Sequence, residues 1–148
     1  EILAILKRMG ANINIEDGIT VSKSDLNGVH IDATHIPDLV PILCVAACKA
    51  TGTTKIVGVE RLKYKESDRI SSTVHMLTGI GADISYDSDA IIIHGGKKLK
   101  GGVIDSVNDH RIAMSGAVAS LLCEGEVTIL GAECVNKSYP KFYEDFLA

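Results

Sequence analysis

The feature that most constrains this chain is a repeat within it. Residues 31–60 align without a gap on residues 104–133, and the upstream string Met-Gly-Ala-Asn-Ile (9–13) matches Ile-Gly-Ala-Asp-Ile (80–84). Self-similarity at a fixed spacing means that one supersecondary unit occurs twice, and that neighbouring units bury their apolar faces on each other. The interpretation of a residue in one copy can therefore be compared with its counterpart in the other.

Each copy carries the same order of secondary-structure signals. An amphipathic helix pattern ends at glycine, two short β segments follow around a polar turn, and a further strand leads into a second helix and a last strand. The paired β segments are 12–15 with 19–22 and 83–86 with 90–94, and the turns are 16–18 and 87–89. This alternation predicts an α/β (α+β) fold with helices packed against mixed β-sheets. We expect one domain of two repeats, about 1–66 and 67–148.

Composition excludes several classes of protein. The net charge of −4 gives no basic footprint for nucleic acid or for an anionic membrane, and no apolar run reaches the ~18 residues of a membrane span. The four cysteines lack the spacing of a metal site and are typical of free thiols in a reducing compartment. We therefore expect a cytoplasmic protein. The chain opens at Glu1 inside a helical pattern, which indicates a piece of a longer protein.

The second helix of each copy begins with chemically different residues. Pro41 is tolerated only in a first turn, which places the N-cap of that helix at Asp38. The counterpart of Asp38 in copy two is Arg111, a cation at the positive end of a helix dipole, where Asn108 or Asp109 can cap instead. Either Arg111 is a solvated surface side chain, or an anion lies between it and the helix end.

A charged run follows the last strand of copy one. Residues 61–69 contain four cations and two acids, between the end of a predicted strand and the start of a predicted helix. Such runs are often solvated and salt-bridged, but the ends of strands are also where α/β proteins bind ligands. Copy two presents Lys137 at the corresponding place. We expect Lys65, Arg69, Arg111 and Lys137 to converge on an anionic ligand.

Four strings resemble motifs of one family. They are His-Ile-Pro-Asp (35–38), Lys-Glu-Ser-Asp-Arg (65–69), Asn-Asp-His-Arg-Ile-Ala-Met (108–114) and Lys-Ser-Tyr-Pro-Lys-Phe (137–142). In order and spacing they are similar to the EPSP synthase (3-phosphoshikimate 1-carboxyvinyltransferase) family, along the whole chain. The resemblance implies repeated βαβαββ units and a match to the last two units of that enzyme's C-terminal domain.

The resemblance also implies a reaction and its binding residues. The family transfers the carboxyvinyl group of phosphoenolpyruvate to the 5-hydroxyl of shikimate 3-phosphate and releases phosphate, in aromatic amino acid biosynthesis, without a metal or an organic cofactor. It is the target of glyphosate. By this resemblance Arg69, Arg111 and Lys137 bind phosphoenolpyruvate, while Lys65 and Asp38 bind shikimate 3-phosphate.

Two carboxyl groups carry the implied acid–base chemistry. By resemblance, Asp38 acts as general base at the attacking hydroxyl, and Glu66 protonates the vinyl carbon. Glu66 sits between Lys65 and Arg69 in the sequence, so we expect it to be ionised until the anionic substrates bind. His110 is a candidate for a supporting role behind the residues that touch substrate.

Other functions remain open from the sequence. The chain lacks counterparts of the family's N-terminal residues, so we expect it to need the remaining N-terminal part of the enzyme and to be inactive alone. The alternatives are a non-catalytic anion-binding module of the same fold, a relative of the UDP-N-acetylglucosamine enolpyruvyl transferase, and an RNA 3′-phosphate cyclase. The last would favour a more basic surface.

Overall fold

The order of elements follows the repeat. The computed structural model describes residues 1–87 and 89–148, so Ser88 of the predicted turn 87–89 lies outside the described residues. The first half contains α1 (Ile2–Arg8), β1 (Asn12–Asn14), β2 (Thr20–Ser22), β3 (His30–Asp32), η1 (Pro37–Leu39), α2 (Val40–Lys49), β4 (Thr53–Val57) and η2 (Glu60–Tyr64). The second half contains α3 (Arg69–Gly79), β5 (Asp83–Asp87), β6 (Ala90–His94), β7 (Gly102–Asp105), α4 (His110–Ser120), β8 (Val127–Leu130), η3 (Ala132–Lys137) and α5 (Phe142–Leu147). The predicted α/β fold is confirmed.

The central sheet joins the two halves. Its strand order is β3-β4-β6-β5, in which β3 and β4 run parallel and the β5–β6 hairpin pairs antiparallel to β4. Ile56 of β4 lies opposite Ile91 of β6. The parallel pair thus comes from the first half and the hairpin from the second. The hairpin β1–β2 and the parallel pair β7–β8 form separate two-stranded sheets.

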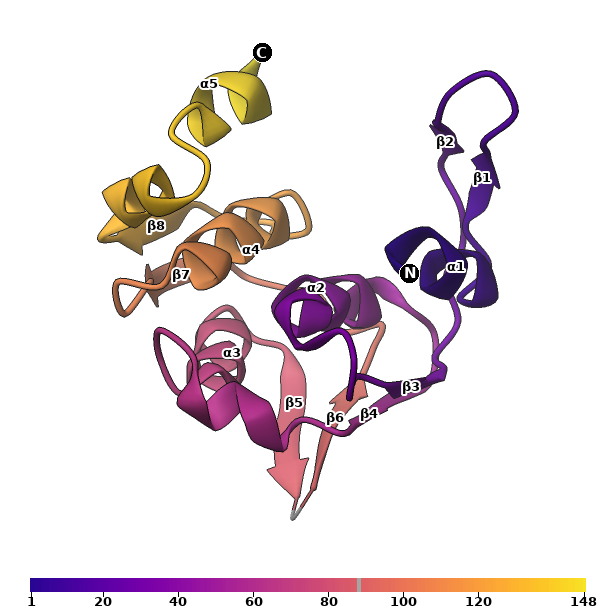
Figure 1. Cartoon of the computed structure of the whole chain (residues 1–148), viewed down its shortest axis with the longest axis horizontal. Coiled ribbons are helices and arrows are strands. Elements are labelled where there is room, and N and C mark those ends of the chain that lie inside the picture. Colours follow the sequence, from indigo (N-terminus) through magenta and orange to yellow (C-terminus); the bar gives the residue numbers. More distant parts are fainter. Residues whose placement is uncertain (88) are drawn as a thin grey trace.

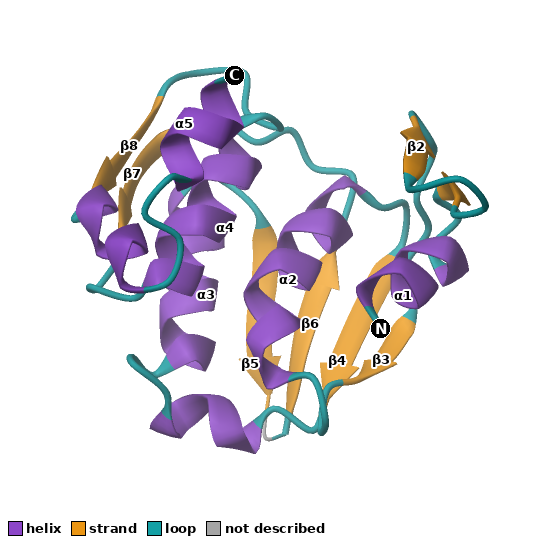
Figure 2. Ribbon diagram, turned by 45° about the horizontal axis from the view of Figure 1, so that its top comes forward, coloured by secondary structure: helices purple, strands orange, loops and turns teal. Residues whose placement is uncertain are grey.

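Helix α2 is the centre of the core. Its sequence is apolar on nearly every side, which is the pattern of a helix buried all round. It lies beside α4 and over the four-stranded sheet, one face of which is covered by helices (Figures 1 and 2). Fully buried aliphatic side chains fill the space between helix and sheet, each worth about 1.5–3 kcal/mol of burial. They include Leu43, Ile56, Ile91 and Ile93.

The two helix starts correct one prediction and settle another. Pro41 does lie in the first turn of α2, but Asp38 is not the N-cap. Residues 37–39 form a 3₁₀ turn, the cap position falls at Leu39, and the Asp38 carboxylate faces cations instead. In copy two, Asp109 is the N-cap of α4 and accepts a 2.9 Å hydrogen bond from the Arg111 backbone N–H.

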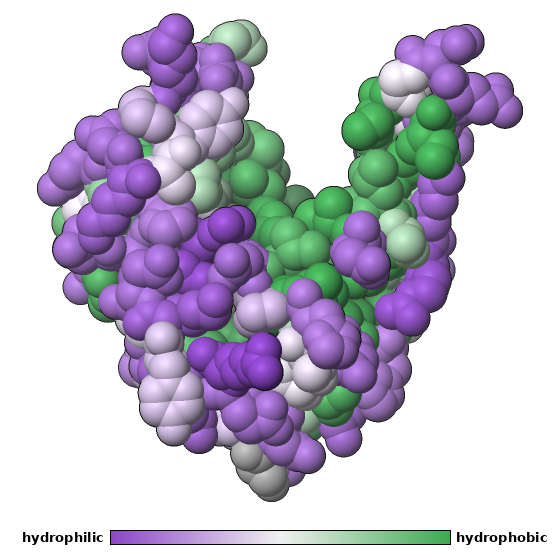
Figure 3. All heavy atoms as spheres, in the orientation of Figure 1, coloured by the Kyte–Doolittle hydropathy of each residue, from purple (hydrophilic) through white to green (hydrophobic). Residues whose placement is uncertain are grey.

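An apolar groove remains open between α1, α2 and α4. Figure 3 shows hydrophobic side chains on the floor of the hollow between the N-terminal hairpin and the C-terminal helix. Leu121, 71% exposed, and Leu122 line it together with Ile2 and Leu6. A groove this apolar is typical of a surface that another element covers. Within the described part of the chain, no helix has the length and apolar character needed to cross a membrane.

Candidate active site

Arg69 lies at the centre of a cluster of charged side chains. It is the first residue of α3, and its side chain is only 1% exposed. Its Nε donates to Asp109 Oδ2 at 2.8 Å, and its Nη2 donates to Asp109 Oδ1 at 3.2 Å. Its Nη1 donates to Asp38 Oδ1 at 2.7 Å, and Nη2 also donates to Glu66 Oε2 at 2.5 Å. One buried guanidinium therefore ties together three carboxylates from different segments.

Asp38 is the point where the cations meet. Besides Arg69, Lys65 Nζ lies 3.2 Å from Oδ1, and Arg111 Nη2 lies 3.7 Å from Oδ2. Partial burial works to raise the pKa of Asp38, but the hydrogen bond from Lys65 and the charges of Lys65, Arg111 and Arg69 outweigh it. The pKa of Asp38 is therefore held below its ordinary value. The carboxylate is 45% exposed, so a ligand can reach it.

The repeat explains why these residues meet. Helices α2 and α4 are counterparts that pack side by side, so the turn before α2, with Asp38, lies next to the start of α4, with Arg111. The segment from η2 to α3 carries Lys65 and Arg69 to the same place. The predicted convergence of Lys65, Arg69 and Arg111 with Asp38 and Glu66 is seen in the structure.

Lys137 lies at the edge of this cluster. Its ammonium donates a 2.6 Å hydrogen bond to the backbone carbonyl of Asn108, directly before the cap of α4. Its contact is thus with the backbone rather than with the carboxylates. Lys137 remains exposed, and its side chain is available to an incoming ligand.

The cluster is nearly neutral by itself. Three carboxylates (Asp38, Glu66 and Asp109) face three cations (Lys65, Arg69 and Arg111) within the described residues. An arginine has five N–H donors, and Arg69 uses four of them on these carboxylates. The charges of this set therefore balance, and Arg69 has little capacity left for a ligand.

The start of α4 offers polar atoms without partners. Arg111 Nε and His110 Nδ1 are buried and have no hydrogen-bond partner among the described residues. A buried polar atom without a partner is costly, and such atoms often await a ligand. A cavity of about 210 Å³ opens beside Arg111, and Asp38, Ile42 and Met114 are among the other residues that line it. This is where a small anion could reach the cluster.

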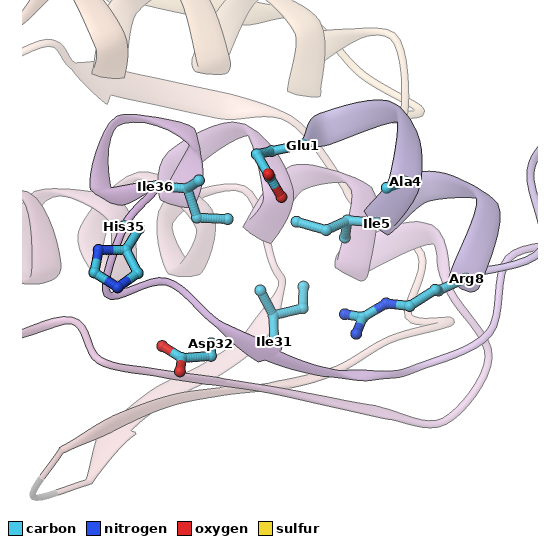
Figure 4. Close-up of a pocket in the computed structure, with 8 residues that line it drawn as sticks. All are labelled: Glu1, Ala4, Ile5, Arg8, Ile31, Asp32, His35 and Ile36. Atoms are coloured by element: carbon cyan, nitrogen blue, oxygen red, sulfur yellow. The ribbon is translucent and has the colours of Figure 1, made fainter.

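A larger cavity lies elsewhere. Figure 4 shows a cavity of about 410 Å³ between α1, with Ile5 and Arg8, and the strand side, with Ile31 and Asp32. The counterpart in the second half has the same volume and lies between α3 and β7. Neither cavity contains a predicted site residue. Since the repeat produces the crevice twice, we attribute it to the architecture of the unit rather than to a binding site.

Asp109 and Ser67 are residues that the sequence analysis did not place in the cluster. Asp109 is fully buried, although it was considered only as a helix cap. Ser67 donates a 2.9 Å hydrogen bond to Asp109 Oδ2. Two residues with positive φ, Val107 (47°) and Asn108 (58°), precede Asp109 and turn it toward the interior. The only sequence signal was an acid next to an arginine at a helix start.

No group of three or more His, Cys, Asp or Glu side chains within residues 1–87 and 89–148 is arranged to hold a metal ion.

The doubled α/β unit with charged helix starts defines an enolpyruvyl transferase-type fold. The enolpyruvyl transferase NikO from Streptomyces tendae aligns with a TM-score of 0.78 over 98% of this chain and 34% of that chain. At 19% identity, this similarity speaks for the fold alone.

The chain belongs to the EPSP synthase family, because the family model described as EPSP synthase (3-phosphoshikimate 1-carboxyvinyltransferase) matches residues 1–146. A 3-phosphoshikimate 1-carboxyvinyltransferase from Clostridium novyi is 52% identical over 98% of this chain and 34% of its own length. One from Halobacterium salinarum is 41% identical over 97% and 34%. The EPSP synthase structure from Acinetobacter baumannii has a TM-score of 0.82 at 37% identity, over 97% of this chain and 37% of that one. The chain spans about a third of the length of these relatives.

Proposed function

We propose that this chain is the C-terminal part of a 3-phosphoshikimate 1-carboxyvinyltransferase and carries part of its active site. The enzyme would transfer the carboxyvinyl group of phosphoenolpyruvate to the 5-hydroxyl of shikimate 3-phosphate and release phosphate. The observation that carries this proposal is the convergence of Lys65, Arg69 and Arg111 on Asp38, with Glu66 beside them. Because the chain belongs to the EPSP synthase family, we interpret this cluster as part of a substrate-binding site.

The cations divide between two anionic substrates. Arg111 has an unpartnered Nε beside the small cavity, and a guanidinium suits bidentate contact with a carboxylate or phosphate. We assign Arg111, Lys137 and Arg69 to phosphoenolpyruvate. Lys65 and Asp38 are assigned to shikimate 3-phosphate. Arg69 is buried and hydrogen-bonded to three carboxylates. It can therefore bind phosphoenolpyruvate in a bidentate way only if its hydrogen bond to Asp38 or to Glu66 breaks.

The reaction proceeds by addition and then elimination. The 5-hydroxyl oxygen attacks C2 of phosphoenolpyruvate and gives its proton to Asp38, while C3 gains a proton from Glu66. The resulting tetrahedral adduct then loses a proton from C3 to one of these two carboxylates, and the C2–O bond to phosphate breaks. Positioned acid–base groups typically contribute about 10²–10⁴-fold in rate.

Substrate charge supplies the change in proton affinity that this scheme needs. The pKa of Asp38 is held low by three cations, which makes it a weak base in the unliganded chain. Anionic substrates that pair with Lys65 and Arg111 would take these charges away from Asp38 and raise its pKa. A substrate that bonds to Arg69 would compete with Glu66 for that guanidinium and release the Glu66 carboxylate.

The rest of the enzyme is the partner that this scheme requires. The two phosphates and two carboxylates of the substrates bring about five to six negative charges, since each phosphate carries close to two. The nearly neutral cluster described above cannot match them, so further cations have to come from the remaining N-terminal part. We therefore propose that the chain is inactive alone.

Four free cysteines support a cytoplasmic location, where thiols stay reduced.

Completing the chain tests the proposal. A chimera joins this chain to the upstream part of the Clostridium novyi relative, and phosphate release is measured with both substrates. We expect turnover in the chimera and none in the chain alone. Glu66→Gln should lower kcat by about 10²–10⁴-fold. Arg111→Ala should lower kcat/KM for phosphoenolpyruvate by about 10–100-fold, the value of a hydrogen bond to a charged group.

A distant exposed lysine provides the control. Lys97 lies on the surface and pairs with Asp83, so Lys97→Ala should leave kcat and both KM values unchanged. A folded chimera that binds both substrates without turnover would indicate a non-catalytic module. Turnover with UDP-N-acetylglucosamine in place of shikimate 3-phosphate would indicate the other enolpyruvyl transferase. Full activity in both Glu66→Gln and Arg111→Ala would refute the residue assignment.

A further inference from the structure

We infer that Asp109 is a positioning residue, which holds Arg69 and the Arg111-bearing start of α4 in one fixed geometry for phosphoenolpyruvate. The inference rests on the proposed function and names a residue that the proposal does not use. Asp109 would not touch the substrate. It acts through the two arginines that it places.

Both oxygens of Asp109 are fully engaged. Oδ2 accepts from Arg69 Nε at 2.8 Å and from Ser67 Oγ at 2.9 Å. Oδ1 accepts from the Arg111 backbone N–H at 2.9 Å and from Arg69 Nη2 at 3.2 Å. The side chain is 0% exposed. One carboxylate thus fixes the plane of the Arg69 guanidinium and the first turn of α4 at the same time.

Helix capping alone does not explain this arrangement. Asp68 caps α3 by accepting from the Ile70 and Ser71 backbone N–H groups, yet it is exposed, and no arginine side chain in the described part of the chain forms an ion pair with it. A cap therefore needs neither burial nor a bidentate cation. The counterpart of Asp109 in copy one is Ile36, which is apolar. The acid is present only in the copy whose helix start carries an arginine.

The charge of Asp109 is maintained despite its burial. Burial works to raise its pKa, but the hydrogen bonds from Arg69, Ser67 and the Arg111 backbone hold the pKa below the ordinary value. The pair therefore stays ionised, and a buried bidentate ion pair permits only one orientation of the guanidinium. Arg69 in turn presents Nη1 to Asp38 and Nη2 to Glu66.

Asp109→Asn in the active chimera tests the inference. The amide keeps one acceptor oxygen but replaces the other with a donor, which in either orientation faces an N–H donor of Arg69 with the wrong polarity. Asn is as good a cap as Asp, so helix capping is retained. We expect KM for phosphoenolpyruvate to rise at least tenfold. KM for shikimate 3-phosphate should change less than threefold, because Lys65 contacts Asp38 and not Asp109.

Asp68→Asn is the matched control. It changes the cap of the neighbouring helix without touching Arg69, and it should leave both KM values within twofold of the wild type. Should Asp109→Asn not fold, Asp109→Ser supplies a second capping residue that lacks the charge. If neither variant folds, Asp109 serves the fold itself and the inference is wrong.

The outcomes separate the inference from the proposed function. An active wild-type chimera whose Asp109→Asn variant keeps its KM for phosphoenolpyruvate and only melts at a lower temperature would overturn the inference alone. Equal rises of both KM values would also overturn it, since they would indicate general damage. A folded wild-type chimera without turnover would refute the proposed function and the inference with it.

Discussion

Replacing Arg69 with methionine is expected to remove about 3–5 kcal/mol from the free energy of unfolding at pH 7. Methionine keeps an unbranched apolar stem in place of the stem of arginine, but it lacks the guanidinium and donates no hydrogen bond. The substitution leaves Asp109, which is fully buried, with an uncompensated charge. Breaking a buried ion pair by removing one partner costs that amount because the remaining charge stays desolvated.

The assay is urea unfolding followed by circular dichroism, with thermal melting beside it. For a chain of 148 residues each kcal/mol shifts Tm by about 2–4 °C, so the variant should melt about 6–20 °C lower. Lys97→Met, which breaks the exposed 3.3 Å pair with Asp83, should cost less than about 1 kcal/mol. Adding Asp109→Asn to Arg69→Met should recover part of the loss, because the orphaned charge is then gone.

The pH dependence of this loss follows from Asp109. In the wild type its folded-state pKa is lowered, so its stabilising effect is present above the unfolded pKa of about 3.9 and is lost as pH falls through the lower folded value. In Arg69→Met burial is opposed only by the hydrogen bonds from Ser67 and the Arg111 backbone, so the pKa of Asp109 is higher than in the wild type and protonation relieves the variant first. The stability difference should therefore shrink as pH falls toward about 4. A loss below about 1 kcal/mol at pH 7, or one independent of pH, would refute the reasoning.

Two further predictions concern packing and thiol reactivity. Gly95→Ala should destabilise by about 1–3 kcal/mol in urea unfolding, because its Cβ would lie 2.1 Å from the Ala50 carbonyl oxygen. Gly79→Ala, whose Cβ would meet the Val103 carbonyl oxygen at an ordinary 3.5 Å, should cost less, and equal losses would contradict this. Burial raises the pKa of Cys48 to about 12, so iodoacetamide at pH 8 should modify Cys123 before Cys48. Mass spectrometry measures the two rates, and alkylation of Cys48 as fast as that of a free thiol would contradict this prediction.

The sequence predicted the elements because their signals are local. Glycine at helix ends, the continuous apolar run of β6 and the restriction on Pro41 depend only on neighbouring residues. The family strings also placed Asp38, Lys65, Arg69 and Arg111 in one cluster, which the ion pairs bear out. Their roles toward substrates stay predictions.

Contacts between the two halves of the chain could not be predicted from these local sequence patterns. The pairing of Ile56 with Ile91 joins a strand of one repeat to a hairpin of the next, and neither segment encodes its partner. The burial of Arg69 under Asp109 was missed for the same reason, since the charged run looked like a solvated surface. Asp38 was predicted as a helix cap because the sequence does not show whether its carboxylate accepts a hydrogen bond from its own helix or pairs with Lys65, which lies far away in the sequence.

The opposite charges of Asp38 and Arg111 have a consequence for the history of the fold. These residues occupy corresponding positions in the two copies, and their side chains lie 3.7 Å apart. An assembly of identical subunits would carry the same residue at both places, and like charges at that distance repel each other. Attraction between the copies at this point requires that each position mutate separately. Such divergence requires that the two copies be encoded by separate stretches of sequence, as they are within this chain.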